Sequence, residues 1–264
     1  MPQIYEITEI ADKTWRILEA GFDAVYYLEG TARGLLIDTG VGMGNIAEAV
    51  AQIATKPYDV VLTHGHYDHL GGIYLFDRVY MNHRDLPMLA DLTDANRRHF
   101  IEHYAEMSEG RSADQDASGM VPSGALPEFI DIDEGYVFSL GERDVEVWAT
   151  PGHTNGSVCL LDAATRLLFA SDTIIYRLLL LCDALKPGQR AAVWRSSTRR
   201  IYDRLSSFSG IYMGHSGRAS DTTIRELAEM ADMMAAGCEM DMSEGVPKLV
   251  YGQTQIYLGM PFKS

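Results

Sequence analysis

Three histidines and one aspartate lie within six consecutive residues, His64-Gly65-His66-Tyr67-Asp68-His69. A segment this short has no room to bury four such side chains as ordinary core. Imidazole and carboxylate groups are the natural ligands of borderline divalent metals, and a cluster of them at fixed spacing is typical of a metal site. The alternative, a solvated polar loop with chance histidines, is disfavoured. The segment therefore predicts a metal-binding loop.

The sequence on either side of this segment indicates how it is held. Residues 58–63 form an apolar run that predicts a short buried strand, and Gly71-Gly72 predict a tight turn after Leu70. The histidines would then lie on a loop between a strand and a helix. Protein scaffolds commonly present their chemistry on such loops.

The composition is that of an ordinary globular protein. The chain has 264 residues, of which 47% are hydrophobic and 22% charged, and no linker divides it, so we expect a single domain over residues 1–264. No apolar run approaches the ~20 residues that span a bilayer, and the first residues do not resemble a secretory signal. Cys159, Cys182 and Cys238 are odd in number and unclustered, which favours free thiols. We therefore expect a cytoplasmic protein with no membrane partner.

The formal net charge of -15 argues against a nucleic acid partner, because phosphate binding is driven by Lys and Arg. A small molecule is the expected substrate, and a homodimer is the one assembly that the sequence leaves open. One basic run stands apart on a predicted helix. Its two interpretations are a solvated helix face paired with acidic neighbours and an anion site, and we favour the first. The run consists of Arg190, Arg195, Arg199, Arg200 and Arg204.

The order of the predicted elements indicates an α/β fold built from two similar halves. Short apolar strands alternate with turns and helices, which predicts sheets covered by helices. One strand in each half ends alike, in Asp38-Thr39 and in Asp172-Thr173. We expect strands at 24–28, 34–37, 60–63, 144–149, 157–161 and 167–171, helices at 45–54 and 221–237, and a closing strand pair at 246–258.

Residues 93–128 separate the two halves as an insertion. The first part, Asp94–Met107, carries apolar residues at helical spacing and predicts an amphipathic helix capped by Thr93 or Asp94. Residues 110–127 are rich in Ser, Ala, Asp, Gly and Pro, and a loop of this length is typically a functional lid or disordered. We expect the insertion to cap the metal cleft.

Two pairs of residues on the insertion helix bear on function. Phe100 and Tyr104 would contact substrate if the insertion is a cap. His99 and His103 lie four residues apart and could chelate a metal, but a helical histidine pair is more often a surface pair. We therefore discount a metal at this pair.

The metal-binding loop carries a family resemblance. Thr63–Gly72 resembles the signature loop of the metallo-β-lactamase-fold hydrolases, and four further motifs recur in the family's order. The resemblance covers roughly residues 4–260 and points to the dinuclear branch that includes glyoxalase II and lactonases. It implies a four-layer αβ/βα sandwich whose two similar halves face each other. The further motifs are residues 35–40, 150–157, 170–173 and Gly214-His215.

The same resemblance implies a ligand set of imidazole and carboxylate groups for two divalent ions, with zinc the first choice and iron or manganese the others. His64, His66 and His153 would hold one ion, Asp68, His69 and His215 the other, and Asp172 would bridge them. Asp38 would accept the second N–H of a ligand imidazole and fix its tautomer, although an ordinary turn aspartate explains it equally well.

A dinuclear site of this kind implies hydrolysis by a metal-bridging hydroxide, because metal coordination lowers the pKa of water to ~7. Asp68 would orient the hydroxide. Tyr176 resembles, one position late, the tyrosine that lactonases of this family place over the metals, and the apolar stretch around it would form either a substrate wall or core. Since the chain has no G-x-S-x-G motif, the expected reaction is metal-dependent cleavage of a small carboxylic ester, lactone or thioester.

Three other functions remain open. A phosphodiester hydrolase would use the same metals, but Thr63–Gly72 and Thr150–Ser157 contain no Lys or Arg to neutralise a phosphate. The one cationic residue in the apolar stretch after Asp172 is Arg177. A mononuclear iron persulfide dioxygenase has the same ligand types. A catalytically idle binding protein is the third, although such a protein has no need to keep a complete ligand set. The basic residues that glyoxalase II uses for glutathione are not evident after His215.

Overall fold

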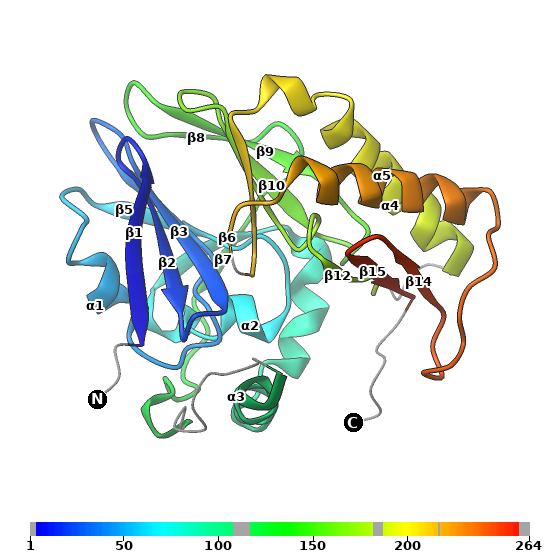
Figure 1. The fold of residues 1–264 in the computed structure, drawn as a ribbon. Coiled ribbons are helices and arrows are strands. Elements are labelled where there is room, and N and C mark those ends of the chain that lie inside the picture. The colour runs from blue at the N-terminus through cyan, green and yellow to red at the C-terminus, as the bar shows by residue number, and fades with distance from the viewer. Residues whose placement is uncertain (1–3, 108–116, 182–186, 216, 259–264) are drawn as a thin grey trace. The chain divides into compact units, whose positions relative to one another are not determined.

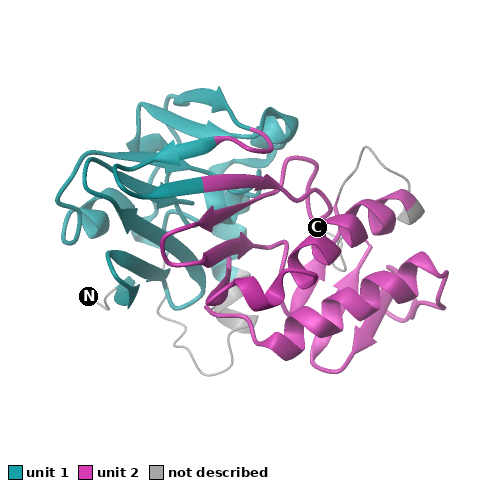
Figure 2. Ribbon diagram, turned by 90° about the horizontal axis from the view of Figure 1, so that it is seen from above, with its two compact units in different colours: residues 1–132, 137–145 teal, residues 133–136, 146–264 magenta. Residues whose placement is uncertain are grey.

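The structure, a computed structural model, describes residues 4–107, 117–181, 187–215 and 217–258 (Figure 1). It contains two compact units (Figure 2). Unit 1 comprises residues 1–132 and 137–145, and unit 2 comprises residues 133–136 and 146–264. Each unit has its own sheet and its own apolar core. Within the described ranges, no helix is both long and apolar enough to cross a membrane.

Unit 1 is built on a seven-stranded sheet in sequential order from β1 to β7. The first four strands pair antiparallel, whereas β4, β5, β6 and β7 pair parallel. The carboxyl ends of parallel strands meet at one edge, where open α/β sheets usually place their ligands. The strands are β1 (Tyr5–Ala11), β2 (Thr14–Glu19), β3 (Asp23–Glu29), β4 (Gly34–Ile37), β5 (Tyr58–Val61), β6 (Arg78–Met81) and β7 (Glu128–Asp131), with β8 (Val137–Ser139) also in unit 1.

The helices of unit 1 begin where the sequence provides caps. At α1 (Ile46–Val50), the Asn45 side chain caps the helix by accepting from the Glu48 amide at 3.2 Å, and it also donates to the Glu48 carboxylate at 2.9 Å. The predicted helix at 45–54 is thus present, but its α-helical part is shorter. The short α2 (Tyr67–Leu70) follows β5, as the signature loop predicts.

The insertion begins with α3 (Asp94–Met107), which has the predicted bounds. Thr93 accepts from the Asn96 amide at 3.1 Å, so the predicted cap is confirmed. Ile101 packs with Met43 and Met120 in a small apolar cluster, so the described part of the insertion belongs to the folded body of unit 1. A 3-10 turn follows at Ala117–Gly119. Residues 108–116 and the side chains at 103–107, which include His103 and Tyr104, lie outside the described residues.

Unit 2 contains four strands in the order β13-β11-β10-β9 and a smaller sheet in the order β12-β15-β14. β10 and β11 pair antiparallel, and β11 and β13 pair parallel. Two long helices, α4 and α5, lie side by side (Figure 2). The elements are β9 (Asp144–Ala149), of which residues 146–149 belong to unit 2, β10 (Val158–Asp162), β11 (Leu167–Ser171), β12 (Arg177–Leu179), α4 (Pro187–Tyr202), β13 (Gly210–Met213), α5 (Asp221–Ala235), β14 (Lys248–Tyr251) and β15 (Thr254–Tyr257).

The two helices of unit 2 bury apolar faces in its core. Ser220 caps α5 by accepting from the Thr223 amide at 3.0 Å, and Leu227 and Met230 are fully buried. Trp194 of α4 is also fully buried in the same cluster. The predicted C-terminal helix and closing strand pair are therefore confirmed, and its methionines serve as core.

Candidate metal centre

The signature loop connects β5 to α2 at the carboxyl edge of the unit 1 sheet. His64 and His69 are each 1% exposed and Asp68 is 9% exposed, so three of its ligand-type side chains are buried. His66 ends the loop, and its carbonyl accepts from the amides of His69 and Leu70. The first turn of α2 therefore begins inside the motif, and this places Asp68 and His69 on a helix.

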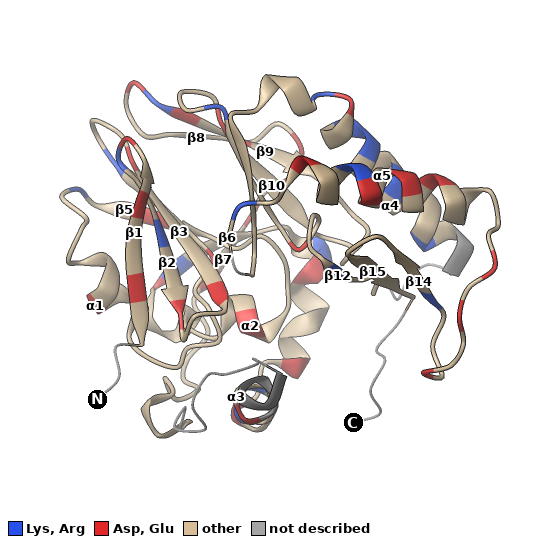
Figure 3. Ribbon diagram, in the orientation of Figure 1, with Lys and Arg blue, Asp and Glu red and all other residues tan. Residues whose placement is uncertain are grey.

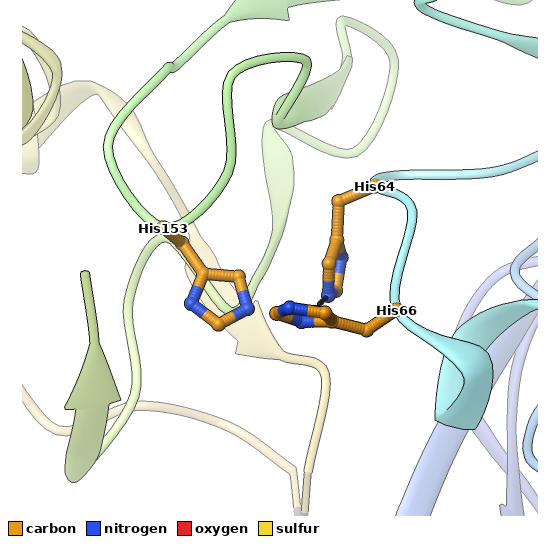
Figure 4. Close-up of side chains that lie close together, drawn as sticks. All are labelled: His64, His66 and His153. Atoms are coloured by element: carbon orange, nitrogen blue, oxygen red, sulfur yellow. Dashed lines mark hydrogen bonds between the residues drawn. The ribbon is translucent and has the colours of Figure 1, made fainter. Parts of the chain in front are cut away.

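The rings of His64 and His66 converge. The Nε2 atom of His64 lies 3.1 Å from the Nδ1 atom of His66 (Figure 4), and the other nitrogen of His64 lies 3.1 Å from the Thr63 hydroxyl. Two ligand nitrogens on a tetrahedral zinc, at about 2.0–2.1 Å from the metal, lie about 3.3 Å apart. The pair therefore fits the spacing that one cation requires.

Asp38 holds the signature loop from the end of β4. Its carboxylate accepts from the Thr63 amide at 2.7 Å and the Thr63 hydroxyl at 2.8 Å, and it lies 3.0 Å from Nδ1 of His69. Its backbone turns with a φ of 64°, a conformation that non-glycine residues seldom adopt. The predicted contact to a histidine of the motif is confirmed, and it assigns the lone pair of His69 to Nε2.

Two further residues of unit 1 hold the signature loop and a third holds the neighbouring loop after β4, and no sequence pattern predicts these contacts. Asp85, 1% exposed, accepts from the Gly65 amide at 2.9 Å. Glu19, also 1% exposed, accepts from the amides of Val41 and Met43 at 2.7 and 2.8 Å. Burial and the charge of Asp23 raise the pKa of Glu19 to about 8. The one signal that the sequence offers is Glu19 itself, because it is a charged residue at the end of an apolar run.

Arg97 is the other residue that holds the signature loop, and it lies on α3. Its guanidinium is fully buried and donates to the carbonyls of Gly71 and Val121, both at 2.7 Å, and to Asp94 at 2.7 Å. Gly71 in turn approaches the Val41 carbonyl so closely that an added Cβ would lie 1.9 Å from that oxygen. The glycine that follows the motif is therefore required by packing, and Arg97 joins the insertion to it.

In unit 2, His153 lies on the loop between β9 and β10. Its Nδ1 atom donates to the Leu179 carbonyl at 2.5 Å, and its backbone carbonyl accepts from the Leu181 amide at 2.8 Å. Gly152 has a φ of 150°, and an added Cβ there would lie 2.6 Å from Cβ of Trp194. Close packing on α4 therefore sets the position of this loop, and Figure 4 shows the His153 ring projecting from it.

Asp172 and His215 follow the carboxyl ends of β11 and β13. The Oδ2 atom of Asp172 lies 3.2 Å from Nε2 of His215 and 3.6 Å from Nε2 of His153. All three side chains are less than 10% exposed. Ser171, with a φ of 44°, turns the chain just before Asp172, as Asp38 does at the end of β4. The structure thus brings together the three predicted ligands of unit 2.

Other residues named from the sequence have simpler surroundings. Tyr176 is 36% exposed, whereas Leu178 and Leu180 are fully buried in the unit 2 core, so those two leucines pack as core. Cys159 is buried, and burial raises the pKa of its thiol to about 11, which leaves it a poor nucleophile. His99 is exposed on α3.

The donor set suits a divalent metal. Each unit presents buried imidazole nitrogens and carboxylate oxygens that converge within 3–4 Å of a neighbour. The second nitrogens of His69 and His153 are fixed by a carboxylate and a backbone carbonyl, the usual partners of metal-ligating histidines. Nitrogen and oxygen donors without cysteine are suited to zinc, iron or manganese.

Comparison with known proteins identifies the family. The profile of the metallo-beta-lactamase superfamily matches residues 19–206, which include every predicted ligand except His215. The chain therefore belongs to the metallo-beta-lactamase superfamily, and the predicted αβ/βα fold class is confirmed. A solved metallo-beta-lactamase from Pontibacter korlensis has the same fold, with a TM-score of 0.58 at 17% identity over 86% of this chain and 99% of that one.

Two curated relatives differ in the bond that they cleave. The human acyl-coenzyme A thioesterase MBLAC2 is 30% identical over 172 residues, which are 60% of this chain and 61% of that protein. The chain thus spans about three fifths of the length of this relative. The exodeoxyribonuclease WalJ of Streptococcus pneumoniae is 24% identical over 256 residues, 86% of this chain and 88% of that protein.

Proposed function

We propose that this hydrolase of the metallo-beta-lactamase superfamily uses two divalent metal ions, zinc first, to cleave a thioester of a small carboxylic acid. Carboxylic esters and lactones form the wider substrate class. The observation that carries the proposal is that each unit holds a buried cluster of converging imidazole and carboxylate groups. The likeness to acyl-coenzyme A thioesterases supports the choice of a thioester.

The proposed ligands are imidazole nitrogens and carboxylate oxygens divided between the two ions. His64, His66 and His153 would hold one ion, Asp68, His69 and His215 would hold the other, and Asp172 would be a ligand shared by both. In this proposal both units form one functional domain.

A bound divalent metal supplies Lewis acidity and lowers the pKa of its water toward neutrality. The chain's own residues prepare the site for this chemistry. Asp38 fixes the tautomer of His69 and the Leu179 carbonyl fixes that of His153, so both present Nε2 for coordination. Asp68, largely buried, would ligate one ion and orient the attacking water. We also retain Tyr176 as a residue that contacts substrate.

The lack of cationic side chains in the motif loops favours cleavage of a carbonyl compound over cleavage of a phosphodiester. Neither Thr63–Gly72 nor Thr150–Ser157 contains Lys or Arg, so the motif loops offer nothing to neutralise a phosphodiester. Residues 93–128 are proposed to cap the cleft, since α3 and Met120 pack on the loop that follows Asp38. The cytoplasm is the proposed compartment, because Cys159 and Cys238 are both free thiols.

A substrate panel tests the proposal. The zinc-, manganese- and iron-loaded protein is assayed on an acyl-coenzyme A, the same acyl group on N-acetylcysteamine, a lactone and a bis-aryl phosphodiester. We expect both thioesters to be hydrolysed faster than the phosphodiester. Because N-acetylcysteamine lacks the nucleotide of coenzyme A, the ratio of the two thioester rates measures any contribution of that nucleotide.

Matched variants give the control. Asp172→Asn should abolish thioester hydrolysis, whereas Asp203→Asn, an exposed position just beyond α4, should retain it. A phosphodiester rate above the best thioester rate, and lowered by Arg177→Ala, would replace this proposal with the phosphodiester hydrolase that the exodeoxyribonuclease relative exemplifies.

A further inference from the structure

Two arginines at the end of α4 and just beyond it stack on the same indole ring but differ in their other contacts. The guanidinium carbons of Arg200 and Arg204 lie 4.3 and 5.1 Å from the centre of the Trp148 ring. Arg200 also forms a two-pronged bond to Glu134, at 2.8 and 2.7 Å. This pair of hydrogen bonds lowers the pKa of Glu134. It also shows that a guanidinium stacked on Trp148 can bind a carboxylate.

Arg204 has the same stacking without a carboxylate. Within the described part of the chain, its guanidinium takes part in no ion pair or hydrogen bond, and neither does that of Arg166. By contrast, Arg195 and Arg199 on α4 both pair with Asp232 of α5, which accounts for the neighbouring basic and acidic bands on these helices (Figure 3). The predicted pairing with acidic neighbours is thus confirmed for those arginines and fails at Arg204.

Both unpaired arginines line one cavity of about 290 Å³. Its volume is near the lower end of the range for small-molecule sites. Most of the remaining lining is apolar or aromatic, so the cavity combines hydrophobic side chains with two guanidinium groups. The other lining residues are Trp148, Leu161, Ala163, Ser207 and Phe208.

The cavity is distinct from the candidate metal centre. Arg166 immediately precedes β11, whereas Asp172 immediately follows it. Ser207 lies before β13, whereas His215 lies after it. A five-residue strand spans roughly 16 Å, so the cavity and the ligand-type side chains of unit 2 lie at opposite ends of the same parallel strands.

We propose that this cavity binds a small organic acid, an apolar or aromatic group that carries one carboxylate. The carboxylate accepts two hydrogen bonds from the guanidinium of Arg204, as Glu134 does from that of Arg200. The guanidinium of Arg166 supplies a second donor group. The apolar part packs on Trp148, Leu161 and Phe208. This inference does not depend on the proposed hydrolysis, because its site and its ligand are separate from the metal centre.

Binding of octanoate, followed by NMR on the full chain, tests the inference. The indole N–H of Trp148 is buried and has no hydrogen-bond partner among the described residues, so its resonance reports on the cavity. We expect a saturable shift of that resonance with octanoate. Arg204→Gln should weaken binding about tenfold to a hundredfold. Arg204→Lys should weaken binding by a smaller factor, because lysine keeps the positive charge but cannot donate two parallel hydrogen bonds to one carboxylate.

Two further variants complete the design. Arg166→Asn should weaken binding about tenfold, and asparagine suits the positive φ of 58° at this position. Arg195→Gln, which alters an arginine outside the cavity, should leave binding unchanged. The inference is overturned if octanoate gives no saturable shift, if the Arg204 and Arg166 variants bind like Arg195→Gln, or if inorganic phosphate binds as tightly as octanoate.

Discussion

Replacement of Arg97 by methionine should destabilise the protein by about 2–6 kcal/mol. The guanidinium is fully buried and donates to two buried carbonyls, those of Gly71 and Val121, at 2.7 Å each. Methionine keeps most of the side-chain volume but no donor, so both oxygens lose a partner at roughly 1–3 kcal/mol each. The side chain of Asp94 is 48% exposed and regains water, so its loss adds little.

Urea unfolding of the metal-free protein measures this effect, since metal binding would otherwise add to the apparent stability. Arg98→Met is the matched control, because the neighbouring Arg98 is exposed on the same helix and should change stability by less than about 0.5 kcal/mol. If Arg97→Met unfolds at the same urea concentration as Arg98→Met, Arg97 does not join the insertion to the signature loop, and the reasoning is refuted.

Three other variants test separate parts of the site. The pKa of Glu19, raised from 4.5 to about 8, means that the folded state binds the proton more tightly, so stability should fall as pH rises from about 4.5 to 8 and level off above. Urea titrations at several pH values should show this slope in the wild type and lose it in Glu19→Gln, and an unchanged slope would exclude this carboxyl as its source. Asp38→Asn should weaken zinc binding about tenfold to a hundredfold in a chelator competition, because His69 loses the acceptor at 3.0 Å; an unaltered zinc affinity would contradict that role. His99→Ala should leave the metal content unchanged by elemental analysis, and metal loss would refute our discounting of the helical histidine pair.

The sequence predicted those parts of the site that lie within one short segment or one recurring motif. His64 and His69 are five residues apart in a single motif, and their proximity follows from local spacing. Asp38 was predicted through its place at the end of a strand in the family pattern, and its contact to His69 was then found. The strand bounds at 34–37, 144–149 and 167–171 matched because each apolar run ends at a turn.

The residues that support the site were not predictable in the same way. Arg97 contacts Gly71 across 26 positions and Asp85 contacts Gly65 across 20, so neither contact leaves a periodic or local signal. In the sequence, Arg97 is one charged residue of an amphipathic helix. Only the packing of α3 on the loop after β4 shows that its side chain points inward and replaces water for two backbone carbonyls.

The central claim is that hydrolysis depends on two metals held by the seven-residue set. The most direct measurement is the rate of thioester hydrolysis as zinc is added stepwise to metal-free protein. We expect no turnover without metal and a rate that rises until about two equivalents are bound. Full activity in the metal-free protein, or a rate that reaches its plateau at one equivalent, would contradict the dinuclear account.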